Sequence, residues 1–163
     1  MEKFGKSQSV TRVEDVRFLT GHGRYVDDIA PEGALFAYFL RATVAHGEIT
    51  ELDVEDAREM PGVQLIVTAD DLVAAGVVLG MGASTIKSRD GSPAAAPMRP
   101  ILAQGRVRHV GEAVAMIVAD SLLAAKDAAE AIMLEIDDLP VHVTLATGGE
   151  TIHPEAPENQ AFD

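Results

Sequence analysis

The stretch V-G-E-A-V-A-M-I-V-A-D, residues 110–120, constrains the fold most, because its centre must be buried. Six apolar residues run from Ala113 to Val118. A membrane span needs about 20 such residues, whereas a short apolar run of this kind is typical of a buried strand. After Asp120 the apolar residues follow helical spacing, and either Asp120 or Ser121 can cap a helix. We therefore expect a buried strand followed directly by a helix.

Other segments predict strands and helices around this centre. Strands are expected over residues 34–44, 49–54, 63–67, 133–136 and 139–143, from their apolar, aromatic and β-branched residues. One short helix is expected near residues 53–60, and a second is expected after Thr68, with Asp71 completing a capping box. The longer helix that starts near Ser121 should bury the side chains of Leu122, Ala125, Ala129 and Ile132.

The order of these elements predicts an α+β fold. It contains a mixed β-sheet with a long strand, two short helices and one longer helix. We expect an N-terminal extended segment over residues 1–20, a folded domain over 21–145 and a C-terminal linker over 146–163. Within the domain, residues 77–98 carry many Gly, Ser and Pro residues and predict an irregular loop. Loops of that length usually have a functional or interface reason.

Charge and cysteine content exclude several classes of function. Thirteen basic residues stand against twenty-six acidic ones, which gives a net charge of −13 and disfavours nucleic acid as a partner. The chain has no cysteine, which excludes disulfides, thiolate zinc sites and cysteine-bound iron–sulfur clusters within it. No apolar run is long enough to span a bilayer. We expect a cytoplasmic protein.

Several short patterns suggest chemistry, but each also has a structural explanation. His46-Gly47-Glu48 matches the H-x-E of zinc deaminases without their cysteine ligands, so a turn between strands is the preferred interpretation. Gly80-Met81-Gly82 begins a phosphate-loop pattern that lacks its third glycine. Adjacent carboxylates on a strand point to opposite faces, which argues against catalysis by the aspartate pairs at 27–28, 70–71 and 137–138.

The histidines and arginines give no stronger signal. The five histidines are not spaced as metal ligands on one helix: His22, His46, His109, His142 and His153. A basic cluster could bind an anion or a cofactor phosphate, although pairing with nearby acids on a surface strand is the preferred interpretation: Arg99, Arg106, Arg108 and His109. Gly111 is expected to supply a turn, and Glu112 to accept backbone N–H groups or pair with Arg108. The residues by themselves predict no active site.

Five phrases, in order, resemble one known family. They are L-T-G-H-G-R-Y-V-D-D-I, A-L-F-A-Y-F-L-R-A-T-V-A-H-G-E-I, D-V-E-D-A-R-E-M-P-G-V-Q-L-I-V-T-A-D-D-L, R-P-I-L-A-Q-G-R-V-R-H-V-G-E-A-V-A-M-I-V-A-D and A-A-K-D-A-A-E-A-I-M-L-E-I-D-D-L-P. Over residues 10–159 the chain resembles the N-terminal α/β hammerhead domain of molybdenum hydroxylase large subunits. These enzymes include xanthine dehydrogenase, aldehyde oxidase and aerobic carbon monoxide dehydrogenase. The chain departs from the family pattern at Gly47, at Ala113, where a proline is usual, and at Ile136-Asp137.

The resemblance implies a non-catalytic domain that supports the molybdenum domains and the subunit contacts. It implies a parent oxidoreductase that acts on aldehydes, heteroaromatic rings or carbon monoxide. The cofactor would be molybdopterin in its cytosine dinucleotide form, with [2Fe–2S] and FAD on partner chains and with a homodimer of the whole complex as an option. The family's cofactor contacts and general-base glutamate lie in later domains. No catalytic, cofactor-binding or metal-binding residue therefore carries over, and the chain alone is expected to be inactive.

Two other functions stay open from the sequence. One is a free-standing protein- or anion-binding module with the hammerhead fold. The other is a self-sufficient hydrolase with an acidic site that no motif advertises.

Overall fold

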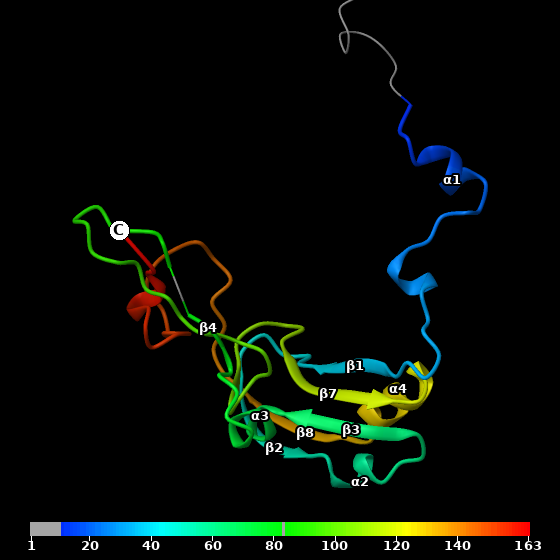
Figure 1. Ribbon diagram of the computed structural model, residues 1–163. Coiled ribbons are helices and arrows are strands. Elements are labelled where there is room, and N and C mark those ends of the chain that lie inside the picture. The colour runs from blue at the N-terminus through cyan, green and yellow to red at the C-terminus, as the bar shows by residue number, and fades with distance from the viewer. Residues whose placement is uncertain (1–10, 83) are drawn as a thin grey trace, which may run out of the picture. The chain divides into compact units, whose positions relative to one another are not determined.

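The computed structural model describes residues 11–82 and 84–163, and the chain forms two compact units, Met1–Ala34 and Leu35–Asp163 (Figure 1). The boundary after Ala34 falls later than the one expected after residue 20. His22 and Tyr25 contact the helix that precedes them, which explains why residues 21–34 belong to the first unit. The His22 N–H donates to the Arg17 carbonyl at 2.9 Å, and the Tyr25 ring stacks on Phe18 with centroids 5.3 Å apart.

Over its described residues, 11–34, the first unit contains one short α-helix, α1 (Asp15–Leu19), and one 3-10 turn, η1 (Val26–Asp28). The prediction of an extended segment over residues 1–20 is therefore wrong for residues 15–19, and residues 1–10 lie outside the described part. The Arg17 guanidinium bonds the Glu14 carboxylate at 2.6 Å, and the Thr20 hydroxyl donates to the Val16 carbonyl at 2.6 Å. These local bonds hold a single turn that is too short to show a periodic pattern.

The described residues of the second unit form two three-stranded sheets and one two-stranded ladder. The first sheet has the order β1 (Phe36–Arg41), β7 (Ala113–Ala119), β3 (Val63–Thr68). The second has the order β6 (Arg106–Val107), β2 (Gly47–Asp53), β8 (Met133–Asp138). The ladder pairs β4 (Gly80–Met81) with β5 (Arg99–Pro100).

Every ladder between these strands is antiparallel. The predicted α+β class is confirmed, but the predicted mixed pairing is wrong. A parallel pair needs a crossover that returns to the same sheet. Here the helix after β7 leads into β8 of the other sheet, and the helix after β2 leads into β3 of the other sheet, so neither connection creates a parallel pair.

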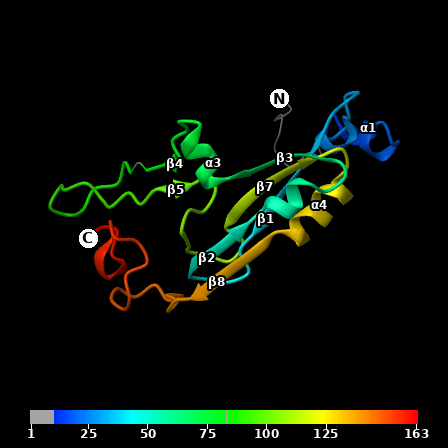
Figure 2. The ribbon, with the colours of Figure 1, turned by 90° about the horizontal axis from the view of Figure 1, so that it is seen from below.

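The main core lies between the sheet β1-β7-β3 and helix α4 (Leu122–Ala131), which lie side by side in Figure 2. On β7, Ala115, Ile117 and Ala119 are buried toward this core, and the predicted central strand is confirmed. Ser121 caps the helix by accepting the Ala124 N–H at 3.1 Å. The helix buries Ala125, Ala128 and Ala129, whose small side chains let it approach the sheet closely. Leu122 was expected in this core but is exposed, because it starts the helix at the edge of the contact.

Two short helices complete the domain as predicted: α2 (Glu55–Arg58) and α3 (Ala69–Ala74). The predicted capping box at α3 is confirmed, because Asp71 Oδ2 accepts the Thr68 N–H at 2.8 Å and Thr68 Oγ1 accepts the Asp71 N–H at 3.3 Å. The Thr68 N–H and, more weakly, the Thr68 hydroxyl and Arg58 lower the pKa of Asp71 below its usual value. The expected long strand over 34–44 is shorter and ends at Arg41, where the pairing register shifts.

The segment predicted to be an irregular loop is mostly irregular over its described residues, 77–82 and 84–98, but short pairings give it the form of a hairpin. Gly80 in β4 pairs with Pro100 in β5, the Ala94 N–H donates to the Ile86 carbonyl at 3.0 Å, and Lys87 forms a bridge with Pro93. A Cβ at residue 80 would lie 1.9 Å from the Arg99 carbonyl oxygen, so this approach requires glycine. Two-residue strands are too short to show alternation, which is why the sequence did not reveal them.

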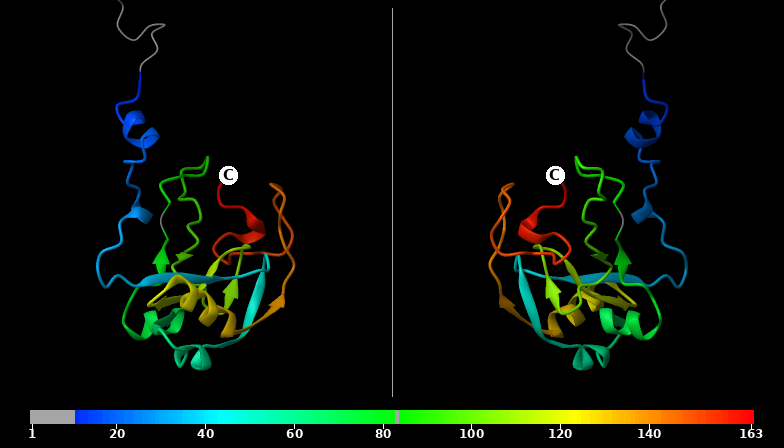
Figure 3. Two further views of the ribbon diagram at one scale, coloured as in Figure 1. Left: turned by 90° about the vertical axis from the view of Figure 1, so that its right-hand side faces the viewer. Right: turned by 90° about the vertical axis from the view of Figure 1, so that its left-hand side faces the viewer.

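The C-terminal residues 146–163, which were expected to be a linker, fold against the 77–98 hairpin (Figure 3). The Ala95 N–H donates to the Ala161 carbonyl at 2.7 Å, and the Arg89 N–H donates to the Asp163 carbonyl at 2.6 Å. The Asn159 side chain accepts the Ile152 N–H and donates to the Gly148 carbonyl, each at 3.0 Å, and this fixes a turn that ends in η2 (Pro157–Asn159). Residues 139–143, which were expected to be a strand, form none.

Candidate functional site

Glu112 occupies the turn between β6 and β7 and is 6% exposed. Its carboxylate oxygen Oε2 accepts the Arg108 backbone N–H at 2.5 Å and lies 3.7 Å from His109 Nδ1. Gly111 supplies the expected turn with a φ of +85°, and its carbonyl accepts the Arg41 guanidinium at 2.8 Å. The prediction that Glu112 accepts a backbone N–H is confirmed, and the carboxylate closes the turn that leads into the central strand.

His46, just before β2, is the other polar residue of the core, with 2% of its surface exposed. Its Nδ1–H donates to the Pro140 carbonyl at 2.7 Å, and its own carbonyl accepts the Leu139 N–H at 2.9 Å. Within the described residues, His46 Nε2 is buried without a hydrogen-bond partner. The side chain thus ties the segment that follows β8 to the start of β2.

A small polar cavity of about 220 Å³ lies where the C-terminal segment meets the domain. Gln104, Arg108, His153 and Glu155 supply its polar lining, and Arg108 Nε donates to the Ile152 carbonyl at 3.3 Å. Burial lowers the pKa of His153, and the Arg108 charge lowers it further, against smaller opposing effects of Glu155 and Glu112. Arg108 therefore joins the 108–112 turn to the C-terminal segment.

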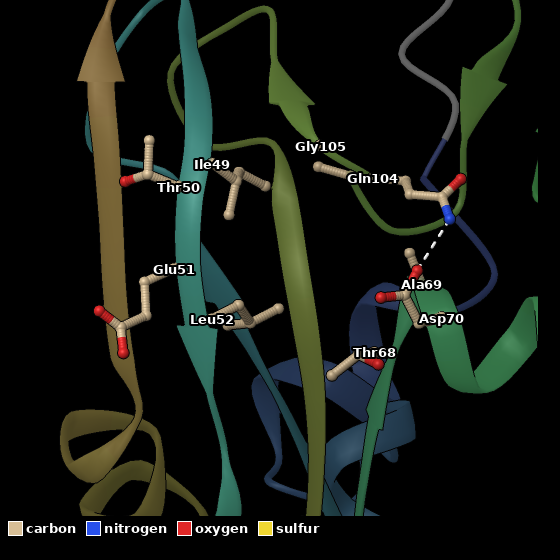
Figure 4. A pocket seen from close by; sticks show the side chains of 10 residues that line it. Ile49, Thr50, Glu51, Leu52, Thr68, Ala69, Asp70, Gln104 and Gly105 are labelled. Carbon is tan, nitrogen blue, oxygen red and sulfur yellow. Dashed lines mark hydrogen bonds between the residues drawn. The ribbon is translucent and has the colours of Figure 1, made fainter.

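A second hollow, of about 230 Å³, lies between β2, the start of α3 and the loop Ala103–Gly105 (Figure 4). Gln104 Nε2 donates to Asp70 Oδ1 across it at 2.8 Å. Figure 4 shows Glu51 on the other side of β2 from Asp70, so the two carboxylates do not face each other. The Thr68 hydroxyl in its lining donates to Asp71 Oδ2 at 2.8 Å, and this pair belongs to the capping box of α3, which gives both groups a structural role.

In the structure, most of the candidate residues from the sequence do not lie together. Gly47 and Glu48 lie in β2 and His46 is buried beside Pro140, so the H-x-E pattern is part of the sheet. In the glycine pattern at residue 80, Gly80 and Met81 form β4, and the next element among the described residues is β5 rather than a helix that could bind phosphate. Arg99 and Arg106 belong to different strands, β5 and β6.

The remaining acids and histidines also have local partners or lie apart. Asp28 accepts the Tyr25 N–H, Asp70 and Asp71 bond Gln104 and Thr68, and Asp137 and Asp138 end β8. His22 contacts Thr20, and His142 contacts the Ala146 carbonyl. Over residues 11–82 and 84–163, no three His, Asp or Glu side chains are grouped as metal ligands.

Sequence reasoning missed the contacts of His46 with Pro140 and of Arg108 with Ile152. These partners lie 94 and 44 residues apart along the chain, and no spacing rule connects them. The apolar surroundings of His46, V-A-H-G-E-I, were the available hint that its ring is buried.

Comparison with known proteins decides the family. A sequence model described as "Aldehyde oxidase and xanthine dehydrogenase, a/b hammerhead domain" matches residues 20–140. The chain belongs to this family. The hammerhead domain accounts for both three-stranded sheets and helix α4, and the α/β hammerhead fold expected from the resemblance is confirmed.

Individual relatives of the hammerhead domain are large subunits of oxidoreductases. This chain is 39% identical to the nicotine 6-hydroxylase large subunit of Paenarthrobacter nicotinovorans, over 92% of this chain and 18% of that subunit. It is 34% identical to the xanthine dehydrogenase molybdenum-binding subunit of Escherichia coli O157:H7, over 87% of this chain and 19% of that subunit. The crystal structure of quinoline 2-oxidoreductase from Pseudomonas putida 86 matches with a TM-score of 0.72 and 39% identity, over 87% of this chain and 17% of that chain.

This chain therefore spans less than a fifth of the length of these relatives. Among the described residues, no helix combines the length and the apolar character that a membrane span requires.

Proposed function

We propose that this chain acts as the N-terminal hammerhead domain of a molybdenum-dependent hydroxylase large subunit, where it supports the molybdenum domains and the subunit contacts without supplying a catalytic residue. The observation that carries the proposal is the family match over residues 20–140, combined with coverage of less than a fifth of each relative. In each relative, more than four fifths of the polypeptide lies outside the matched region and can form the catalytic domains.

The use of the buried polar residues supports a structural role. Glu112 closes a turn through the Arg108 N–H, and His46 holds the Pro140 carbonyl. Buried polar groups that are bonded to backbone in this way fix one arrangement of the chain. Neither side chain pairs with a nucleophile in the described part of the chain, and the parent's general base belongs to a later domain in this proposal.

The cofactors are assigned to other parts of the enzyme. The chain has no cysteine to ligate a [2Fe–2S] cluster, and the described residues provide no grouped donors that fit a metal centre. Molybdopterin, in its cytosine dinucleotide form, would be bound by the remaining domains of the large subunit. The [2Fe–2S] centres and FAD would lie on partner chains of a cytoplasmic complex, which could pair into a homodimer.

The substrate class that we favour for the parent enzyme is a nitrogen-containing heteroaromatic ring. Two relatives at 39% identity are named for nicotine and quinoline, which both contain such a ring. Aldehydes and carbon monoxide are the alternatives within the family.

The native length of the polypeptide tests this proposal. Antibodies against residues 35–163 should detect a polypeptide several times longer than this chain in the source cells, and its peptides should continue into molybdenum-binding domains. A native polypeptide that ends at Asp163, with no adjacent large-subunit remainder, would contradict the proposal and favour a free-standing binding module.

A further inference from the structure

The sheet β1-β7-β3 has a second face, opposite the core. Side chains alternate across a sheet, and Tyr38, Leu40 and Ile117 point toward helix α4. The residues between them point the other way and lie side by side in the strand register. They are all apolar: Ala37 and Phe39 on β1, Met116 and Val118 on β7, and Leu65 and Val67 on β3. We call these six residues the outer apolar face.

None of the six residues is buried in this chain. Leu65 is 49% exposed, Ala37 is exposed, and the other four are half-buried. Helix α4 packs on the core side of the same sheet. A solvated sheet face normally carries polar residues, as the second sheet does with Glu48, Glu51 and Glu135. The outer apolar face is therefore built for contact with another surface.

Polar groups border this face at both ends of the strands. At one end, Arg41 lies over the Phe39 ring, 5.6 Å from its centroid, and bonds the Gly111 carbonyl. At the other end, the Gln64 amide donates to Asp120 Oδ1 at 3.0 Å. An apolar centre with a polar rim is the usual anatomy of a protein–protein interface.

The edge of the sheet at β1 continues the outer apolar face. The edge strand β1 reads F-A-Y-F-L-R, with one charge at its end, and a hollow of about 370 Å³ runs along Ala37–Arg41. Proteins usually protect a free edge with lysine, proline or a bulge, because an unprotected edge pairs with other chains. Most of β1 lacks such protection, which indicates that this side of the sheet is covered in the working protein.

We propose that the outer apolar face is the surface on which the remainder of the large subunit packs. The occupant follows from chain length, because this chain provides 16–19% of its curated relatives and the rest of such a subunit must join it through some surface. The partner surface is apolar and belongs to the same polypeptide. The inference rests on the proposed function, since it needs a longer large subunit.

Thiol labelling tests this assignment with little perturbation. The chain has no cysteine, so Leu65→Cys places a single thiol on the outer apolar face, and Leu122→Cys places a matched thiol on α4, on the core side of the sheet. The two leucines are similarly exposed, at 49% and 44%. Maleimide labelling would be followed by peptide mass analysis in the 163-residue chain and in the complete large subunit. We expect Leu65→Cys to react at least about tenfold more slowly in the complete subunit, and Leu122→Cys to react equally in both.

Three outcomes would overturn the inference. Equal labelling of Leu65→Cys in both proteins would show that the face stays in solvent. Equal protection at both positions would show a general slowing that is not specific to this face. Concentration-dependent protection of Leu65→Cys in the 163-residue chain would assign the face to a second copy. A failure of the proposed function is recognised separately. In that case, the source cells contain no polypeptide that carries this sequence and is longer than this chain.

Discussion

Replacement of Glu112 by glutamine is the sharpest perturbation of the core. Glutamine has almost the same shape and keeps an oxygen that can accept the Arg108 N–H, but it removes the charge. Replacement by alanine removes the acceptor and leaves the Arg108 N–H without this partner. The two variants therefore separate the contribution of the charge from that of the hydrogen bond.

The size of each effect follows from the burial of the carboxylate. A hydrogen bond to a charged group contributes about 1.5–3 kcal/mol to stability and a neutral one about 0.5–1.5 kcal/mol, so Glu112→Gln should cost about 1 kcal/mol. Glu112→Ala should cost about 2–3 kcal/mol, because the Arg108 N–H then loses its charged acceptor in a part-buried turn. Urea unfolding of the 163-residue chain, followed by circular dichroism, measures both. Glu135→Gln is the matched control on the exposed face of β8 and should stay within about 0.5 kcal/mol of the parent.

The same variants distinguish a structural carboxylate from a catalytic one. In the complete enzyme, Glu112→Gln should leave turnover close to that of the parent at a temperature where both stay folded. Unchanged urea midpoints for both Glu112 variants, together with a turnover lost on removal of the charge alone, would refute the reasoning.

Three further predictions concern the core, the second sheet and the C-terminal cavity. Ile117→Ala, at a fully buried position between the sheet and α4, should lower the free energy of unfolding by about 2–5 kcal/mol in a urea titration, and a loss below 1 kcal/mol would mean that this core is wrongly placed. Glu135 lies directly opposite Glu51, so Glu135→Lys should raise stability by about 0.2–1 kcal/mol, and a gain that does not shrink in high salt would argue against a charge effect. Because the pKa of His153 is lowered in the folded chain, its contribution to the free energy of unfolding is fully present above its usual pKa of 6.5. That contribution is lost as the pH falls through the lower pKa of the folded state. His153→Gln should therefore flatten the fall of the urea midpoint from pH 7.5 to pH 5, and an unchanged slope would contradict this.

Sequence patterns predicted the parts of the fold that local chemistry determines. Three such features are the apolar run of β7, the Ser121 cap of α4 and the Thr68–Asp71 capping box. Within each of them, the residues involved are only a few positions apart in the sequence. The class α+β followed from their order. Such signals work because the hydrogen-bonding or packing partner is close in sequence.

The remaining features depend on distant partners and left no such trace. The β4–β5 ladder, the contact of Ala95 with Ala161 and the bond from His46 to Pro140 join segments that are far apart in the chain. Antiparallel pairing throughout also arose from which sheet each helix leads into, and that is decided by packing between layers. The same limit applies to the outer apolar face, because its six residues come from three strands that meet only in the folded sheet.

Molybdenum stoichiometry tests most directly whether this chain is a supporting domain. Elemental analysis of the purified 163-residue chain should find far less than one molybdenum atom per chain, with no bound pterin, whereas the complete large subunit from the same cells should hold about one atom per chain. One equivalent of molybdenum and pterin on the 163-residue chain alone would contradict the proposal and place the cofactor site within these residues.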